Sequence, residues 1–321
     1  MLVAVTAGDG SPSFPELPLD YCFTDTTGWY PWRFDVENPK LGELDLSRLL
    51  DAPAGKHGFS TVGENGQIVF ADGTRGRFFG TNVGGARCCP EKKQAEIWAE
   101  RLAAYGVNLL RLHTYDSKWG GIIDYSKGNS RSLNPETLDR MDYFVAELKK
   151  RGIYVYFDLL DYRSLLPGDE VRDADQMDTR WENSIKGCSI FNRRIIDLQK
   201  EFATQLLTHR NPYTGLRYVD EPALLIQEIT TENSLFYLGN PNLILPSYRH
   251  ELEGLWNQWL AKQYPTRAKL LAAWTTPPAS APSRPPRTPR RTRSNCRRPT
   301  SAPSWRRAIG TPSGPRSGST P

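Results

Sequence analysis

Apolar and polar positions alternate along the middle of the chain in a repeated strand-then-helix order. Short apolar runs predict four strands, at 78–82, 107–113, 153–160 and 223–229. The stretch after each run carries apolar residues at helical spacing, which predicts helices over 90–105, 135–151, 191–209 and 247–264. Four consecutive β–α units are typical of a parallel sheet wrapped by helices, built either as a doubly wound sheet or as a (β/α)8 barrel.

The region before the first of these strands has a different pattern. Three short strand-like runs, at 58–62, 67–71 and 75–79, are separated by the turn signals Asn65-Gly66 and Asp72-Gly73. They predict a small antiparallel β-hairpin cap. Residues 1–56 read as an irregular segment that contains one short amphipathic stretch, Leu44 to Leu50.

The last 47 residues break the pattern abruptly. After Trp274 the chain consists mainly of Arg, Pro, Ser and Thr, with no Lys, Asp or Glu, and we expect this tail to be disordered because it cannot bury a core. The composition favours a reading-frame shift near Trp274. A genuine basic tail and a nucleic-acid-binding arm are the alternatives. The sequence thus divides into an irregular segment (1–56), a partial barrel (57–274) and a tail (275–321).

Composition and charge narrow the class of protein. The 321 residues are 38% hydrophobic and 11% aromatic, which suits a globular core. The net charge of +5 comes from ten Arg in the tail, because residues 1–274 carry 31 basic and 36 acidic side chains. Nucleic acid is therefore not the expected partner. No apolar run is long enough for a membrane helix, and no signal peptide is visible, so the location stays open, with export possible.

Cofactor and metal signals are weak throughout. The Gly80–Gly85 segment does not match a dinucleotide or phosphate loop, so we expect no nucleotide cofactor. The five Cys form no C-x-x-C pair, and the four His lack metal-ligand spacing. The sequence therefore predicts no cofactor and no catalytic metal.

Polar residues at the ends of the predicted strands are the candidates for chemistry, since barrel enzymes build their sites there. They are Asn82, Arg111, His113, Asp116, Asp161 and Glu232. Partial burial of Glu232 would suit it to donate a proton to a leaving oxygen, while a water-facing loop carboxylate is the alternative. Glu228 lies four residues earlier, so we expect it to share a face with Glu232 and to form a structural ion pair.

Arg111 and several aromatic residues complete the candidate site. Arg111 lies between leucines, so it must reach the mouth of a barrel or pair with a carboxylate. Four aromatics in the long loops could stack on sugar faces or simply pack the loops: Tyr115, Trp119, Tyr162 and Trp181. Three tryptophans on helical faces are expected in the core: Trp98, Trp256 and Trp259.

Four segments, taken together and in this order, resemble clan A glycoside hydrolases, above all the cellulase-like members of glycoside hydrolase family 5. They are RFFGTN ending at Asn82, VNLLRLH ending at His113, LKKRGIYVYFDL from Leu148, and NPYTGLRYVDEPALLIQEITTENS from Asn211. The resemblance implies a (β/α)8 barrel and retaining hydrolysis of β-linked oligo- or polysaccharides by two Glu residues.

Carried over by position, the resemblance implies that Glu232 is the acid/base, that Arg111 supports the nucleophile and that His113 lies in the substrate pocket. Thr231 stands where the family usually has an Asn that binds the sugar 2-hydroxyl. Asn82 lies at the end of the first barrel strand in the matched string, and we place it among the substrate-binding residues.

The resemblance stops after four β–α units, as if the barrel were truncated. A retaining enzyme needs a second carboxylate about 5–5.5 Å from the first. The only acidic residues after Glu232 are Glu251 and Glu253, in a predicted helix. An open half-barrel would expose two sheet edges and a bare apolar interior, so we expect poor solubility and no glycosidase activity unless the chain dimerises.

Three other functions stay open at this point. The first is a non-catalytic carbohydrate-binding remnant that uses the loop aromatics. The second is a binder of nucleic acid or anionic surfaces through the Arg-rich tail. The third, a barrel lyase or aldolase, would need a Schiff-base Lys or a metal cluster at a strand end, and the sequence shows neither.

Overall fold

The computed structural model describes residues 5–6, 12–13, 27–28, 41–177, 184–233 and 244–275. The chain divides into two compact units, 1–258 and 259–321, which are considered separately. The predicted disorder of residues 275–321 falls almost wholly outside the described residues. The structure describes residue 275 alone of this tail, at the end of a helix.

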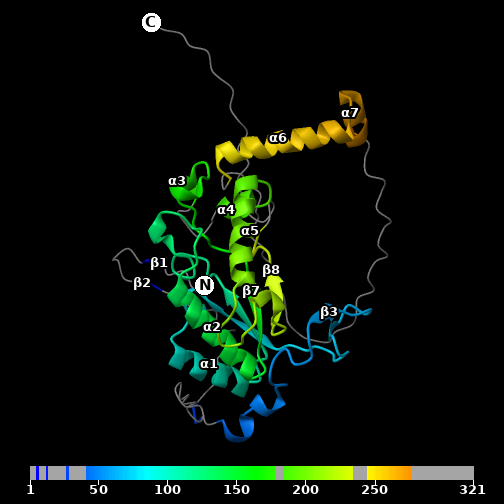
Figure 1. The fold of residues 1–321 in the computed structure, drawn as a ribbon. Coiled ribbons are helices and arrows are strands. Elements are labelled where there is room, and N and C mark those ends of the chain that lie inside the picture. The colour runs from blue at the N-terminus through cyan, green and yellow to red at the C-terminus, as the bar shows by residue number, and fades with distance from the viewer. Residues whose placement is uncertain are drawn as a thin grey trace. The chain divides into compact units, whose positions relative to one another are not determined.

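A four-stranded parallel sheet forms the centre of the first unit (Figure 1). Its strands follow one another in chain order: β5 Gly80–Gly84, β6 Leu109–His113, β7 Tyr154–Asp158 and β8 Leu224–Glu228. The four predicted strands are confirmed, although β5 begins at Gly80, two residues later than expected. The register sets Asn82 opposite Arg111, Arg111 opposite Tyr156, and Asp158 opposite Glu228.

Three long helices connect these strands, as the periodicity predicts: α1 Lys92–Ala104, α2 Pro135–Lys150 and α5 Arg193–Thr208. The Asn134 side chain caps α2 by accepting a hydrogen bond from the Glu136 backbone N–H at 3.0 Å. Asn192 caps α5 in the same way, accepting from Ile195 at 3.1 Å. Gly152, with a φ of +81°, ends the α2 segment in a conformation that suits glycine.

All three helices pack on one face of the sheet. Alternate strand residues on that face are fully buried: Leu110, Leu112, Val155 and Phe157. They share one core with residues of each helix, such as Ala99 of α1, Phe144 of α2 and Phe202 of α5. A doubly wound sheet carries helices on both faces. The sequential strand order with helices on a single face is the arrangement found in (β/α) barrels instead.

A hairpin packs near the start of the strands. It joins β3 Ser60–Val62 and β4 Ile68–Phe70 in antiparallel register, which confirms the predicted cap. The Phe70 ring stacks on Tyr154 at 5.3 Å, and Phe78 meets Tyr154 edge-on at 5.5 Å. The third predicted run, 75–79, adds only an isolated bridge between Arg75 and Val69.

The described part of the N-terminal segment is small. It holds the paired strands β1 Val5–Thr6 and β2 Pro12–Ser13, and two 3-10 helices, Gly42–Leu44 and Ser47–Leu49. Leu44 and Leu49 are exposed, so the predicted amphipathic stretch does not bury a continuous apolar face. The structure breaks it into two short turns, which cannot keep a 3.6-residue stripe on one side.

The long loop between β7 and α5 contains the short helices α3 Ala174–Met177 and α4 Ser184–Cys188. Beyond β8, helix α6 covers Pro246–Gln263 and α7 covers Arg267–Thr275, the latter within the second unit. Trp98 packs against Phe144 beside the core, as predicted. The prediction for Trp256 and Trp259 is wrong. Both are nearly half exposed, because Tyr248 is the residue that α6 buries.

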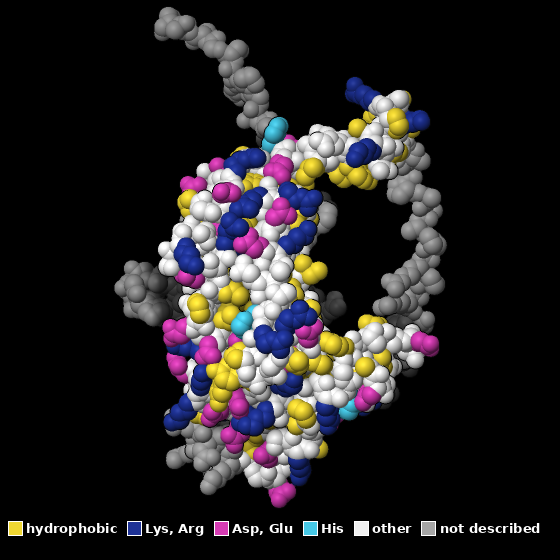
Figure 2. Space-filling view, viewed as in Figure 1, with side chains coloured by type: hydrophobic (Ala, Val, Ile, Leu, Met, Phe, Trp, Pro, Cys, Tyr) yellow, Lys and Arg dark blue, Asp and Glu magenta, His cyan; other side chains and the backbone are white. Residues whose placement is uncertain are grey.

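The surface of the described residues is mixed in charge. Figure 2 shows basic and acidic side chains interspersed over the face that it draws. Among the described residues, no helix is both long enough and apolar enough to cross a lipid bilayer.

Candidate active site

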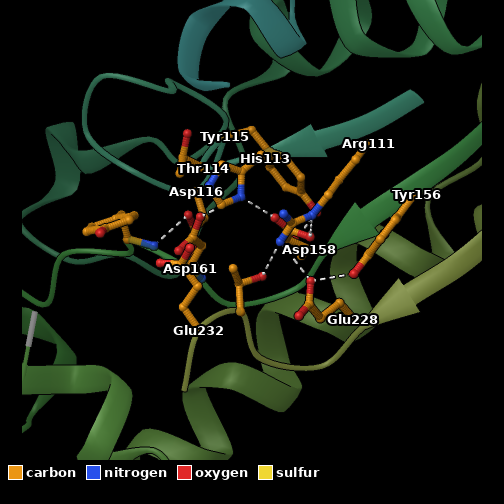
Figure 3. Close-up of polar contacts among 12 residues, drawn as sticks. Arg111, His113, Thr114, Tyr115, Asp116, Tyr156, Asp158, Asp161, Glu228 and Glu232 are labelled. Carbon is orange, nitrogen blue, oxygen red and sulfur yellow. Dashed lines mark hydrogen bonds and ion pairs between the residues drawn. The ribbon is translucent and has the colours of Figure 1, made fainter. Parts of the chain in front are cut away.

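Arg111 is the centre of an ion-pair network at the carboxyl ends of the strands (Figure 3). Its Nε lies 2.9 Å from Asp158 Oδ1, and its Nη2 lies 2.8 Å from Glu228 Oε2. Arg111 alternates with Leu110 and Leu112, so it projects from the face of β6 opposite the helices. The expected ion pair of Glu228 is confirmed, and of the two alternatives for Arg111 the structure shows pairing with carboxylates.

Tyr156 supports this pair from the neighbouring strand. Its hydroxyl donates to Glu228 Oε2 at 2.6 Å, and the Arg111 guanidinium lies 5.1 Å from the centre of its ring. Burial acts to raise the pKa of Glu228, but hydrogen bonds, first among them that from Tyr156, and the Arg111 charge hold it below its ordinary value. Glu228 therefore stays ionised as the partner of Arg111.

His113, at the end of β6, bridges two buried carboxylates. Its Nδ1 lies 2.6 Å from Asp158 Oδ2 and 3.0 Å from Asp161 Oδ2. The hydrogen bonds to Asp158 and Asp161 raise the pKa of His113 to about 9, so its imidazole is protonated at neutral pH. The ring is fixed as a cation between two acids.

Lys186 of α4 extends the network toward Glu232. Its Nζ lies 2.7 Å from Asp161 Oδ1 and 3.8 Å from Glu232 Oε2. It also lies 4.3 Å from the centre of the Tyr162 ring. Since the side chain is almost fully buried, these partners are what makes its charge tolerable.

The atoms of His113, Asp158 and Asp161 lie close enough together to be considered as metal ligands. Arg111 and Lys186 already occupy the other oxygens of the two aspartates. The group therefore fits an ion-pair network better than a metal centre.

Glu232 lies in a turn just beyond β8. The strand ends at Glu228, and Glu232 has a φ of +48°, in the left-handed region. The expectation that Glu228 and Glu232 share a strand face is wrong, because two-residue alternation does not continue through this turn. The Glu232 side chain is 54% exposed, so it meets solvent rather than a closed pocket.

Trp119 and Tyr162 form an aromatic pair next to Lys186. Their ring centres are 6.2 Å apart, and Trp119 is 57% exposed. Gly85 makes room for the indole, because a Cβ there would lie 2.4 Å from Trp119 Cε3. These two residues lie where exposed loop aromatics were expected, and Trp181 lies outside the described residues.

Tyr115 does not belong to that exposed set: of its two expected roles, stacking on a sugar or packing, the structure supports packing, so its place among the substrate-binding residues is wrong. It is fully buried, and its hydroxyl donates to the carbonyl oxygen of Asp158. Thr114 before it has a φ of +58°, which breaks the strand alternation and turns Tyr115 into the core against Phe157.

The remaining candidates have different surroundings. Thr231 is buried, and its hydroxyl accepts from Arg111 Nη2 at 3.2 Å. Asn82 is exposed on β5, in register with Arg111. Asp116 accepts hydrogen bonds from the backbone of residues 161–163, and burial raises its pKa to about 6. Asp116 thus holds the loop after β7 in place.

The sequence reasoning missed three members of the network: Tyr156, Asp158 and Lys186. Asp158 lies within the apolar run 153–160, and this position was a usable signal, since a buried carboxylate needs a partner. Lys186 had no comparable signal, because it lies 25 residues beyond its partner Asp161 in a long loop.

No family model matches the chain, and neither does any curated protein. Several solved structures are similar in part. One is an endo-1,4-β-mannanase from Rhizomucor miehei, with 22% identity over 54% of this chain and 48% of that chain, and a TM-score of 0.42. A glycoside hydrolase family 5 mannosidase from the same organism has 13% identity over 56% and 49%, with a TM-score of 0.42.

An endo-β-1,4-mannanase from Thermotoga petrophila is similar at 21% identity over 49% of this chain and 35% of that chain, with a TM-score of 0.34. The chain spans half or less of the length of each of these structures.

Proposed function

We propose that the four β–α units are half of a glycoside hydrolase-type (β/α)8 barrel, and that the carboxyl ends of its strands bind a β-linked oligosaccharide. The sequential parallel strands with helices on one face support the barrel. The strand motifs that resemble family 5 support the class of reaction.

The observation that carries this proposal is a row of neighbours that runs from Trp119 to Tyr162, to Lys186 and to Glu232. An exposed indole offers a flat apolar face on which a sugar ring can stack. Glu232, at the other end of the row, offers a solvent-accessible carboxyl group. This arrangement sets a carboxyl group beside a surface where a glycan could lie.

In the proposed chemistry, Glu232 protonates the glycosidic oxygen as it leaves and later activates water. Arg111, His113, Thr231 and Asn82 belong to the substrate-binding set, and Trp181 remains a proposed stacking residue. A retaining reaction also needs a nucleophilic carboxylate about 5–5.5 Å away. The printed sequence offers only Glu251 and Glu253 after Glu232, both on α6. Because α6 is not at a strand end, we expect a single copy of this chain to bind glycans without hydrolysing them.

Calorimetric titration with β-1,4-linked gluco- and manno-oligosaccharides tests the binding. We expect Trp119→Ala to weaken binding at least tenfold, about 1.4 kcal/mol, because the stacking surface is lost. Trp274→Ala is the matched control, since Trp274 is 60% exposed but lies in the second unit. Equal losses in the two variants, or no binding by the wild-type chain, would contradict the proposal.

A second assay separates binding from hydrolysis. Glu232→Gln keeps the size and polarity of the side chain, so we expect oligosaccharide affinity within about threefold of the wild type, less than 1 kcal/mol. Aryl β-glucosides and β-mannosides should not be turned over by the monomer of either variant. If a wild-type monomer hydrolyses these substrates and Glu232→Gln abolishes the turnover, Glu232 is the acid/base. The expectation that a single copy lacks a nucleophilic carboxylate is then wrong.

A further inference from the structure

Both outer strands of the sheet lack a hydrogen-bonding neighbour among the described residues. β5 pairs with β6 and β8 pairs with β7, and no other described strand joins this sheet. An unpaired strand edge presents N–H and C=O groups that favour pairing with another strand. The two edges belong to opposite sides of one sheet and run in the same direction.

Apolar surface accompanies both edges. A groove of about 400 Å³ lies between the end of β8 and α5, lined mainly by apolar residues that include Leu159, Ile190, Ile196 and Ile229. Ile229 is 70% exposed at this edge. Beside the other edge, Phe79 is 65% exposed immediately before β5. Large apolar side chains at a strand edge are typical of an interface.

We propose that a second copy of this chain closes the sheet, so that β8 of each copy pairs with β5 of the other. A two-fold axis parallel to the strands keeps all eight strands parallel and makes the two contacts identical. Four strands are half of the eight that close a (β/α)8 barrel. The two contacts of one dimer therefore remove both free edges of each copy, and no edge is left for further growth.

The charges on the inner face are compatible with this closure. That face is not the bare apolar surface expected from the sequence, because it carries the Arg111 network. Arg111, His113 and Lys186 are matched by three carboxylates, those of Asp158, Asp161 and Glu228. Enclosing this network between two copies would thus bury paired charges, which costs far less than burying an unpaired one.

This inference rests on the sheet and its edges, and it does not require that the site bind glycans. It does have a consequence for the site. With the axis parallel to the strands, the carboxyl ends of both copies face one common mouth, so each copy brings its own Glu232 there.

Sedimentation velocity of the full chain over 1–100 µM tests the proposal. We expect a species of about twice the 36.3 kDa monomer mass. Ile229→Lys at the β8 edge and Phe79→Lys at the β5 edge should each give monomers, because a charge would lie in both seams of the dimer. Leu49→Lys is the control, since Leu49 is 71% exposed and remote in sequence from both edges.

Mixing the two edge variants sharpens the result. In a mixed dimer one seam carries both substitutions and the other carries none, so we expect dimers to reappear in part. Circular dichroism of each variant must match the wild type, so that loss of the dimer is not confused with unfolding. A wild-type monomer at every concentration, open-ended growth beyond the dimer, or dimers unaffected by Ile229→Lys would each overturn the proposal.

Discussion

The two faces of the sheet differ in the chemistry of their side chains. The face toward the helices is a continuous apolar core that includes Leu110, Leu112, Val155 and Phe157. The opposite face carries Arg111, Tyr156 and Glu228, whose charges and hydroxyl are satisfied by one another. Because side chains alternate along a strand, β7 contributes Val155 and Phe157 to the apolar core and Tyr156 and Asp158 to the polar network.

The comparison has an energetic meaning. Burial of apolar area stabilises the fold without directional requirements. A buried ion-pair network contributes little net stability but is sensitive to the loss of any one partner. The two faces should therefore respond differently to substitutions of neighbouring residues in the same strand.

The largest effect should come from Phe157→Ala. Phe157 is fully buried on the apolar face, so its removal should lower the free energy of unfolding by about 3–5 kcal/mol. Tyr156→Phe, one residue earlier and on the other face, removes only the hydroxyl donor to Glu228 and should cost about 1 kcal/mol. Urea denaturation at one protein concentration measures both. Similar losses would erase the distinction between the faces.

A smaller effect should follow from Asp158→Asn, which keeps the shape of the side chain but removes the charge shared by Arg111 and His113. We expect a loss of about 2–3 kcal/mol, because two cations then lack a full counter-charge at a buried site.

Asp139→Asn is the matched control for Asp158→Asn. Asp139 pairs with Lys92 at 2.9 Å on the surface, so this variant should lose less than about 1 kcal/mol. If the two Asn variants unfold at the same urea concentration, the polar face does not hold a cooperative network.

Apart from the control variants, the smallest effect should appear on raising the pH. The pKa of His113 is raised to about 9 by its hydrogen bonds to Asp158 and Asp161. Its stabilising contribution is therefore complete below the unfolded value of about 6.5 and is lost as the pH rises through 9. Between pH 6.5 and 9.5 the unfolding free energy should fall by about 1–2 kcal/mol more in the wild type than in His113→Gln, after allowance for the partly exposed ring. Both chains share a further decline, because burial raises the thiol pKa of Cys88, Cys89 and Cys188, and unfolded thiols ionise in this window.

A control must distinguish the contribution of His113 from that of His57, whose pKa is also raised. The pKa of His57 is raised by Asp51 and Asp72, at the hairpin. His113→Gln should flatten the decline with pH, whereas His57→Gln should leave the part due to His113 intact. Asp116, with a pKa near 6, has largely completed its titration below this window. A decline of the same size in the wild type and in the His113 variant would contradict the prediction.

Sequence reasoning succeeded where a residue's neighbours in the chain determine its environment. Leucines on either side of Arg111 limited it to the barrel mouth or a carboxylate partner, and the second is found. The 3.6-residue spacing located α1, α2 and α5 to within two residues. It failed at Tyr115 and Glu232, which follow the ends of strands. In each case a residue with positive φ, Thr114 or Glu232 itself, interrupts the alternation on which the prediction relied.

The sequence alone predicted the order of strands and helices and the apolar side of each. It also limited Arg111 to the barrel mouth or a carboxylate partner. These are local consequences of periodicity and of the cost of burying a charge. The choice of partners was decided in three dimensions. Asp158 reaches Arg111 and His113 from the next strand, and Lys186 reaches Asp161 and Glu232 from a distant helix. Such contacts depend on how strands pair and loops return, and no spacing along the chain encodes them.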